Sequence, residues 1–513
     1  MPSGNVPPMN RDDMLGRLRT ETTPWDVLVI GGGATGLGCA LDAAARGLRT
    51  ALVERGDFAH GTSSRSTKLA HGGVRYLRAG QFSLVAQSLR ERERLRRNAA
   101  GIVHPAPFVV PAYRFYERAF YGAGLLLYGL LSPAGDETRV LSRADTIARL
   151  PGLHRDGLRG GVLYHDGQFD DARLALALAR SAARHGAAVV NHVCVDGIAR
   201  SGARVSGVIA HDVETGAAFE IGARVVINAA GIGVDAVRRM DDPAATAMVR
   251  TSRGTHIVLD ESFSPGGTAI LVPNTEDGRV LFVIPWRGRL LVGTTDTPSN
   301  VTNDEPVAAG DDVDYLLRHA ARYLATAPQP ADIRSVYAGL RPLLAGSGST
   351  ASLRRDHRVV VSPGGLVTIT GGKWTTYRLM AEHAVDRACA VARLSAPAST
   401  TPRLALDIPP ENAARDPLEA RAMAETDDGG GTDAALDAFV RDAVRNDMAR
   451  TIEDVLARRS RALLLDARGA ARLAPRVAAV LAREFGRDND WQREQIREFE
   501  KTAARYLPPH ADQ

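Results

Sequence analysis

The spacing of apolar residues changes along the chain and predicts three kinds of structure in succession. Residues 25–54 have the pattern of a strand, a glycine turn, a helix and a second strand. The apolar run at 27–30 is typical of a buried parallel strand, and residues 37–44 carry apolar side chains at helical spacing until Gly47 ends the helix. Two parallel strands joined by a helix predict a right-handed βαβ unit.

Later segments repeat this unit and then depart from it. A helix headed by Asp171 leads to a strand at 224–231, and a strand, glycine turn and helix recur at 366–392. Between 249 and 341, short runs of β-branched residues separated by turn signals favour an antiparallel sheet. Helical periodicity returns from 433 to 506 and predicts three to four helices. Breaks in this last pattern fall near Arg450, Gly469 and Gly486.

Composition and charge exclude several classes of protein. Hydrophobic residues make up 44% and charged residues 24% of the 513-residue chain, values that are ordinary for a globular protein of two or three domains. A net charge of +5 is small for this length and argues as much for an anionic membrane surface or substrate as for nucleic acid. Three scattered cysteines, Cys39, Cys194 and Cys389, lack metal-like spacing, so we expect no metal site, no disulfide scaffold and a reducing compartment.

No segment has the composition of a secretory signal or of a membrane-spanning helix. The first residues lack a basic region followed by an apolar core. The longest apolar run, at 121–135, is well short of the roughly 20 residues that span a bilayer. We interpret this run as a buried helix, and the alternative is an element that dips into a membrane.

The turn of the first βαβ unit carries Gly31-x-Gly33-x-x-Gly36 directly between strand and helix, which is the context of a dinucleotide site. Gly31 permits the tight turn, Gly33 lets the backbone approach a pyrophosphate, and Gly36 allows close packing of the helix. The helix N-terminus adds N–H donors and the positive end of its dipole. Glu54 ends the second strand, where a carboxylate can accept hydrogen bonds from an adenosine ribose. A purely structural turn would not need this acidic residue.

The segment TSSRSTKLAHGGVRYL at 62–77 crowds hydroxyl and basic side chains into one loop. A nicotinamide dehydrogenase usually continues with further βα units, whereas here the strand INAAG returns only about 170 residues later. Such donors can saturate phosphate and isoalloxazine acceptors, so the loop favours a flavin; an exposed polar loop is the alternative. Lysine occurs only at Lys68, Lys373 and Lys501, and two of these lie in glycine-rich loops where a compact ammonium group suits a site.

The chain resembles the flavin-dependent (aerobic) glycerol-3-phosphate dehydrogenases in seven motifs that occur in the same order. These are DVLVIGGGATGLG, TSSRSTKLAHGGVRYL, VINAAG, VIPWRGRLLVGTTDT, YAGLRPLL, LRRDHRV and ITGGKWTTYRLMAEHAVD. The tail NDMARTIEDVLARRSRALLLDA is similar to the helical C-terminal cap of that family. The resemblance extends from about residue 25 to 506, and HGGxRYL and GGKxTTYR are far more specific than the glycine pattern.

The resemblance implies an α/β fold of the D-amino-acid-oxidase-like flavoproteins. It consists of a Rossmann-like FAD-binding domain, an inserted antiparallel-sheet substrate domain and a C-terminal α-helical cap domain. We therefore predict a flexible leader (1–24), three FAD-binding segments (25–103, 161–240 and 346–393), two substrate-domain segments (104–160 and 241–345), a linker (394–431) and a helical C-terminal domain (432–513).

The resemblance also implies the reaction and its partners. It implies that non-covalently bound FAD takes a hydride at N5 from C2 of sn-glycerol 3-phosphate, which becomes dihydroxyacetone phosphate. Reduced flavin would then pass its electrons to a membrane quinone. We expect a cytoplasmic protein with peripheral contact to the inner face of the membrane, a homodimer by analogy alone, and no nucleic-acid partner.

By position in the family motifs, a group of cationic and aromatic residues is implied to bind the substrate: Arg75, Tyr76, Arg341, Arg355 and Lys373. Arginine suits the phosphate because its forked donors match two oxygens at once. We hypothesise that Arg341 and Lys373 stabilise the developing oxyanion and that the proton leaves through His71 or water. A surface salt bridge is the default interpretation for any single arginine in so arginine-rich a chain.

The predicted cofactor contacts come from the glycine turn, the end of the second strand, the donor-rich loop and the two later glycine-containing turns. They are Gly31, Gly33, Ala34, Thr35, Gly36, Glu54, Arg55, Thr62, Ser63, Ser64, Ser66, Lys68, Leu69, His71, Gly72, Gly73, Ala230, Gly231, Gly372, Lys373 and Thr375.

Two other functions remain open from the sequence. The first is a glycerol-3-phosphate oxidase, which passes electrons to O₂ and forms hydrogen peroxide; such relatives carry an inserted segment that is absent here. The second is a non-catalytic FAD-binding protein. The cations Arg75, Arg341, Arg355 and Lys373 argue against it, because a flavin kept for structure needs no phosphate-binding cluster.

Overall fold

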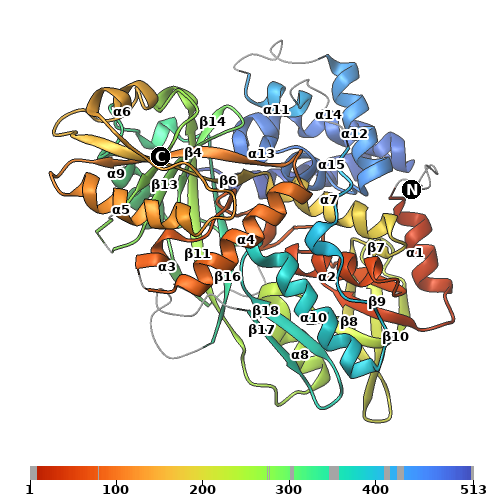
Figure 1. Cartoon of the computed structure of the whole chain (residues 1–513). Helices are drawn as coiled ribbons and strands as arrows, with labels where there is room; N and C mark the ends of the chain where they lie inside the picture. The colour runs from red at the N-terminus through yellow and green to blue at the C-terminus, as the bar shows by residue number, and fades with distance from the viewer. Residues whose placement is uncertain are drawn as a thin grey trace.

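Two sheets form the framework of the molecule, with helices packed against them (Figure 1). The computed structural model describes residues 9–78, 80–273, 275–276, 278–300, 305–345, 357–409, 416–424 and 432–509, apart from the side chains of residues 75 and 78. The fold is the predicted one: a Rossmann-like FAD-binding fold, a second sheet and a C-terminal group of helices.

The first sheet has the strand order β17-β18-β10-β1-β2-β7, and β8 and β9 extend it from β10. β1 is central because Val27, Leu28 and Val29 are fully buried and pair in parallel with β2 on one side and β10 on the other. The strands are β1 Trp25–Ile30, β2 Thr50–Val53, β7 Ala188–Val190, β8 Val193–Ser201, β9 Arg204–Asp212, β10 Ala218–Asn228, β17 His357–Val361 and β18 Val367–Gly371. The helices that pack with this sheet are α2 Ala34–Ala45, α7 Asp171–Arg184, α8 Val234–Asp241 and α10 Tyr377–Ala392.

The second sheet has the order β15-β11-β14-β13-β12-β4-β6-β3, with β16 on β11 and β5 on β6. All its pairs are antiparallel except β12 with β4. Its strands are β3 Leu69–Ala70, β4 Val103–Ala112, β5 Arg139–Leu141, β6 Gly160–Phe169, β11 Val249–Asp260, β12 Ala269–Val272, β13 Leu281–Trp286, β14 Arg289–Gly293, β15 Thr297–Ser299 and β16 Ser335–Leu344. The helices in this part of the chain are α3 Val74–Arg78, α4 Phe82–Asn98, α5 Glu117–Leu130, α6 Arg143–Arg149 and α9 Gly310–Ala321.

One predicted boundary differs from the structure. We assigned residues 161–240 to the FAD-binding domain, but β6 pairs along its whole length with β4 in the second sheet. Residues 160–169 are buried at nearly every position, and continuous burial looks the same in either sheet. The chain enters the FAD-binding domain only at α7.

The predicted flexible leader contains a helix, α1 Arg11–Thr20, so that prediction is wrong for this stretch. Asn10 caps the helix by accepting from the Asp13 amide at 3.1 Å, and Leu15 and Leu18 are buried against the first sheet. Arg11 is also buried, in an ion pair with Asp212 at 2.6 Å. A buried arginine makes the segment look polar in sequence although it packs against the core.

The C-terminal helices share one hydrophobic core with the second sheet. Trp286 and Tyr337 of that sheet belong to the same buried cluster as Leu463 and Leu464. The elements are α11 Pro417–Ala422, α12 Asp433–Asp447, a π-helical turn Asp454–Arg459, α13 Ala462–Leu465, α14 Ala467–Phe485 and α15 Asn489–Ala504. The predicted break at Gly486 is present, but Gly469 lies inside α14. A Cβ at Gly469 would lie 1.9 Å from the Ala422 carbonyl oxygen, so this glycine permits close contact with α11.

The longest apolar run forms α5, but our interpretation of it as a buried helix is wrong. Leu125 and Tyr128 face inward, whereas Phe120, Leu126 and Leu130 are 58%, 55% and 76% exposed. α5 is therefore an amphipathic helix that displays apolar side chains at the molecular surface. Among the helices that the structure describes, none combines the length and the apolar character needed to cross a bilayer.

Candidate functional site

A large cavity lies between the two sheets, with a volume of about 1280 Å³. The first sheet contributes the turns after β1, β10 and β18, and the second contributes residues of β11 and β16. The donor-rich loop at 62–77 crosses between them. The cavity extends from Glu54 past Gly31 to Lys373, so the predicted dinucleotide and substrate regions are continuous.

Close main-chain packing builds the glycine turn. Gly31 has a φ of +110°, and a Cβ there would lie 2.7 Å from the Ala229 carbonyl oxygen. A Cβ on Gly36 would lie 1.8 Å from the Gly31 carbonyl oxygen, so Gly36 supports the turn from behind and does not line the cavity. Gly33 precedes the first residue of α2 and has no side chain to cap it. Apart from the Ala34 amide, which donates to the Ser63 hydroxyl, the amides of the helix N-terminus can therefore receive an anion.

Glu54 is held at the end of β2 by the backbone of neighbouring turns. Its carboxylate accepts hydrogen bonds from the amides of Gly32 at 2.6 Å and Gly56 at 2.9 Å. Arg55 lines the cavity beside it. Three residues that we did not predict as cofactor contacts, Val193, Cys194 and Val195, also line the cavity. They come from β8, which pairs with β9, and the Val193 amide donates to the Glu54 carbonyl at 2.8 Å only after the chain has folded.

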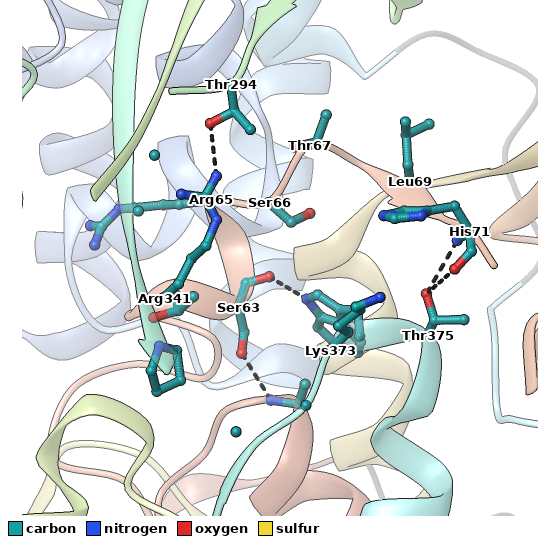
Figure 2. A pocket seen from close by; sticks show the side chains of 18 of the residues that line it. Ser63, Arg65, Ser66, Thr67, Leu69, His71, Thr294, Arg341, Lys373 and Thr375 are labelled. Atoms are coloured by element: carbon teal, nitrogen blue, oxygen red, sulfur yellow. Dashed lines mark hydrogen bonds between the residues drawn. The ribbon is translucent and has the colours of Figure 1, made fainter. Parts of the chain in front are cut away.

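The donor-rich loop presents one set of groups to the cavity and another to the protein interior. Thr62, Ser63 and Ser66 line the cavity. The Ser63 hydroxyl accepts from the Ala34 amide at 3.0 Å, and its carbonyl accepts from Trp374 Nε1 at 2.8 Å (Figure 2). The loop is thus tied to both the helix N-terminus and the later glycine turn.

Lys68 lies on the interior side of this loop and not in the cavity. It is fully buried, and its Nζ donates to the Ser64 carbonyl and to Asp171, both at 2.7 Å. Burial lowers the pKa of Lys68 to about 8, opposed by the nearby Asp171 carboxylate. Ser64 and Gly72 also lie outside the cavity lining. Lys68 and Ser64 therefore support the loop, in contrast to the direct flavin contacts that we predicted for them.

Cationic groups gather at the far end of the cavity, where Arg341 and Lys373 approach it from β16 and from the turn after β18 (Figure 2). Arg341 Nη2 donates to the Thr294 hydroxyl at 3.0 Å. Lys373 Nζ lies 4.2 Å from the centre of the Tyr76 ring, a cation–π distance. Arg355 and the side chain of Arg75 lie outside the described residues, so their predicted roles stay predictions.

The cation end of the cavity depends on a glycine in the adjacent strand. Gly254 of β11 is paired with β16, and a Cβ there would lie 2.3 Å from Nη2 of Arg341. The guanidinium group therefore lies flat over Gly254. His71 reaches the same end, with its backbone amide donating to the Thr375 hydroxyl at 3.2 Å.

His256 is a cavity residue that our reasoning from the sequence missed. It is 2% exposed, its Nε2 lies 2.9 Å from the Thr67 hydroxyl, and its ring stacks on Tyr337 at 4.6 Å. Burial, reinforced by Lys68 and Arg341, holds the pKa of His256 well below its usual value, so the ring is neutral near pH 7. One signal was available: His256 follows Gly254 at the two-residue period of a strand and so lies on the same face.

The remaining predicted cofactor residues line the cavity together. They are Gly31, Gly33, Ala34, Thr35, Leu69, Gly73, Ala230, Gly231, Gly372 and Thr375. Open amides at a helix N-terminus, a carboxylate at the adenosine end and a cation at the opposite end fit the pyrophosphate, the ribose and the flavin ring of FAD.

Comparison with known proteins defines the class and then the family. Residues 26–387 match the family described as FAD dependent oxidoreductase, and residues 412–493 match the C-terminal domain of alpha-glycerophosphate oxidase. The protein is thus an FAD-dependent oxidoreductase. The mitochondrial glycerol-3-phosphate dehydrogenase of Homo sapiens is 37% identical over 98% of this chain and 76% of its own length. The probable mitochondrial enzyme of Caenorhabditis elegans is 38% identical over 95% of this chain and 74% of its own. The chain belongs to the FAD-dependent glycerol-3-phosphate dehydrogenase family.

Solved structures agree with this assignment. The glycerol-3-phosphate dehydrogenase from Bacillus halodurans, complexed with FAD, has a TM-score of 0.78 at 28% identity, covering 99% of this chain and 100% of its own. The L-alpha-glycerophosphate oxidase of Mycoplasma pneumoniae, at 18% identity and a TM-score of 0.57 over 74% of this chain and 97% of its own, shares the fold.

Proposed function

We propose that the protein oxidises sn-glycerol 3-phosphate to dihydroxyacetone phosphate. The observation that carries this proposal is the convergence of Arg341 and Lys373 on the cavity that also contains the glycine turn. A small phosphomonoester needs several cations beside the redox centre, whereas a flavin alone does not. The names of the relatives support the same substrate.

The chain's own residues would bind the substrate and manage its proton. Bound FAD supplies the hydride acceptor. As the C2 hydroxyl loses its proton, Arg341 and Lys373 stabilise the negative charge that develops on its oxygen. His71 or water takes the proton, as we hypothesised from the sequence. His256 adds a neutral ring that orients the hydroxyl, because its buried Nδ1 has no hydrogen-bond partner among the described residues.

We further propose a membrane quinone as the electron acceptor. Phe120 and Leu127 of α5 line the cavity and are also 58% and 41% exposed. An apolar acceptor at the membrane surface can therefore reach the cavity along α5. The oxidase alternative is compatible with the same family and differs only in the acceptor.

Anaerobic reduction tests the substrate proposal. Glycerol 3-phosphate added to the holoenzyme should bleach the flavin absorbance, and glycerol should not, because glycerol lacks the phosphate that the cations bind. Persistent flavin absorbance would refute the proposal. Reoxidation separates the acceptors: a quinone analogue should restore the oxidised spectrum rapidly, whereas equally fast recovery with O₂ alone would establish the oxidase.

A further inference from the structure

The C-terminal helices contact the wall of the cavity from behind. Among the described residues, none after Thr375 lines the cavity. Yet the segment at 57–65, which separates the cavity from the C-terminal helices, is held by several contacts with that domain. Arg458 Nε donates to Asp57 at 2.5 Å, Arg461 Nη2 donates to the Ser64 carbonyl at 2.9 Å, and Arg65 Nε donates to the Tyr506 hydroxyl at 3.4 Å. Arg459 also pairs with Asp57, and His60 Nε2 lies 3.5 Å from the Glu453 carboxylate.

Arg461 makes the contact that reaches the backbone of this segment. It lies between the π-helical turn and α13, and it is only 1% exposed. Its Nη1 donates to the Ala457 carbonyl at 2.6 Å within its own domain. Its Nη2 donates to the Ser64 carbonyl and also to Asp171 Oδ1 at 3.0 Å. One guanidinium group therefore joins the C-terminal domain, the donor-rich loop and the first residue of α7.

Charge compensation makes this contact stable in the interior. Asp171 is fully buried and accepts from Lys68 Nζ at 2.7 Å as well as from Arg461. Its Oδ2 also accepts from the Ser66 amide at 3.0 Å and the Ser66 hydroxyl at 2.7 Å. The Ser64 carbonyl receives donors from both Lys68 and Arg461. Two cationic donors on one carbonyl fix the peptide group between Ser64 and Arg65 in a single orientation.

The orientation of the peptide group after Ser64 determines the position of Ser63, the neighbouring residue that faces the cavity. Ser63 directly precedes Ser64, and its hydroxyl accepts from the Ala34 amide at the N-terminus of α2. The Ser63 carbonyl accepts from Trp374, next to Lys373. The geometry of the flavin-facing side of this loop is therefore set by contacts on its opposite side, which the C-terminal domain supplies.

We propose that the C-terminal helical domain is a clamp for FAD and that Arg461 is its principal positioning residue. Arg461 touches neither the cavity nor the substrate-facing cations, and it acts through the Ser64 carbonyl and Asp171. The clamp rests on FAD binding, which the family establishes, and not on the proposed substrate. A negative result for FAD release would therefore leave the proposed substrate standing, and a negative result for flavin bleaching would leave the clamp standing.

Substitution of Arg461 should release FAD, whereas loss of another buried arginine at the same domain interface should not. Arg461→Met in the full-length holoenzyme removes the contacts with the Ser64 carbonyl and Asp171, and FAD should dissociate about 10- to 100-fold faster on dilution, read as the rise in flavin fluorescence. Arg289→Met is the matched control. Arg289 is 7% exposed, pairs with Asp260 at 2.8 Å and contacts Leu465 and Asp466 of the C-terminal domain; its contacts with described residues do not include the loop at 57–68.

The two variants and a conservative one distinguish positioning from general destabilisation. Both methionine variants should lower the melting temperature, and only Arg461→Met should accelerate FAD release. Arg461→Lys should give an intermediate rate, because lysine keeps the charge but cannot donate to two acceptors in a fork. Equal FAD release from Arg461→Met and Arg289→Met, or an unchanged rate in Arg461→Met, would overturn the clamp.

A measurement on the wild-type protein does not depend on how the variants fold. Coupling between two sites is reciprocal, so FAD must protect the clamp as the clamp protects FAD. Amide hydrogen exchange of the holoenzyme should be slower than that of the FAD-depleted protein at residues 457–465. Exchange in α15, whose described residues form no hydrogen bond or ion pair with the segment at 57–65, should not change. Unchanged exchange at 457–465 would also overturn the proposal.

Discussion

Replacement of Gly36 by alanine should disrupt the dinucleotide turn, because the added methyl group collides with main-chain atoms. The new Cβ would lie 1.8 Å from the Gly31 carbonyl oxygen. The two segments must separate by roughly 1 Å or more to restore normal contact, and overpacking of this kind costs about 1–3 kcal/mol. We expect the upper end of that range because neither partner is a flexible side chain. The same displacement moves the open amides of α2 away from the pyrophosphate.

The assay compares Gly36→Ala with Gly16→Ala, the same substitution at a site without constraint. Gly16 lies inside α1 with nothing within 4 Å of an added Cβ, so alanine there should raise the free energy of unfolding by about 0.5–1 kcal/mol. Urea unfolding gives both changes, and flavin fluorescence titration gives FAD affinity. Gly36→Ala should weaken FAD binding at least about tenfold, and Gly16→Ala should leave it unchanged. Wild-type stability and FAD affinity in Gly36→Ala would refute the argument from close packing.

Three further results are expected. Arg341→Lys should reduce flavin reduction at saturating glycerol 3-phosphate about 100-fold while FAD stays bound, and unchanged turnover would exclude Arg341 from oxyanion stabilisation. Burial, followed by repulsion from Glu419, raises the pKa of Asp416 to about 8, so the folded state retains a proton that the unfolded state releases above pH 4. Stability in urea should therefore fall as pH rises toward 8, and Asp416→Asn should flatten that slope. Leu126→Ser combined with Leu130→Ser should weaken co-sedimentation with anionic vesicles without changing the melting temperature, and unchanged binding would remove α5 from membrane contact.

Much of the fold could be predicted from local patterns in the sequence. The first βαβ unit was predictable because its glycine turn, helix and strands are set by neighbouring residues. The extent of the FAD-binding domain was not, because β6 is buried on both faces and its sheet is decided by pairing with β4. α1 was missed because its buried Arg11 depends on Asp212, a partner that only the folded chain brings near.

In the candidate site, too, some residues could be predicted from local spacing and others depend on contacts between distant segments. Gly31, Gly33 and Glu54 could be found because spacing encodes their roles. The role of Lys68 could not, since its environment is set by Asp171, about 100 residues later, and by Arg461 in another domain. His256 lay in a strand that was correctly predicted, but nothing local shows that this face of β11 meets the donor-rich loop. Contacts between distant segments are what the sequence pattern leaves undetermined.

The central position of β1 has a consequence for how the cell makes this protein. β1 pairs with β10, which in turn pairs with β18, so the cavity that Gly31 lines is complete only after residues near Lys373 have been synthesised. At about 5–20 residues per second, roughly 20–70 s of translation separate these segments. Until β10 at 218–228 has been synthesised, the edge of β1 opposite β2 lacks its partner, and the nascent chain must be shielded there. We therefore expect FAD loading to be a late event in biogenesis, and we expect a chain that ends before Lys373 to lose the cofactor.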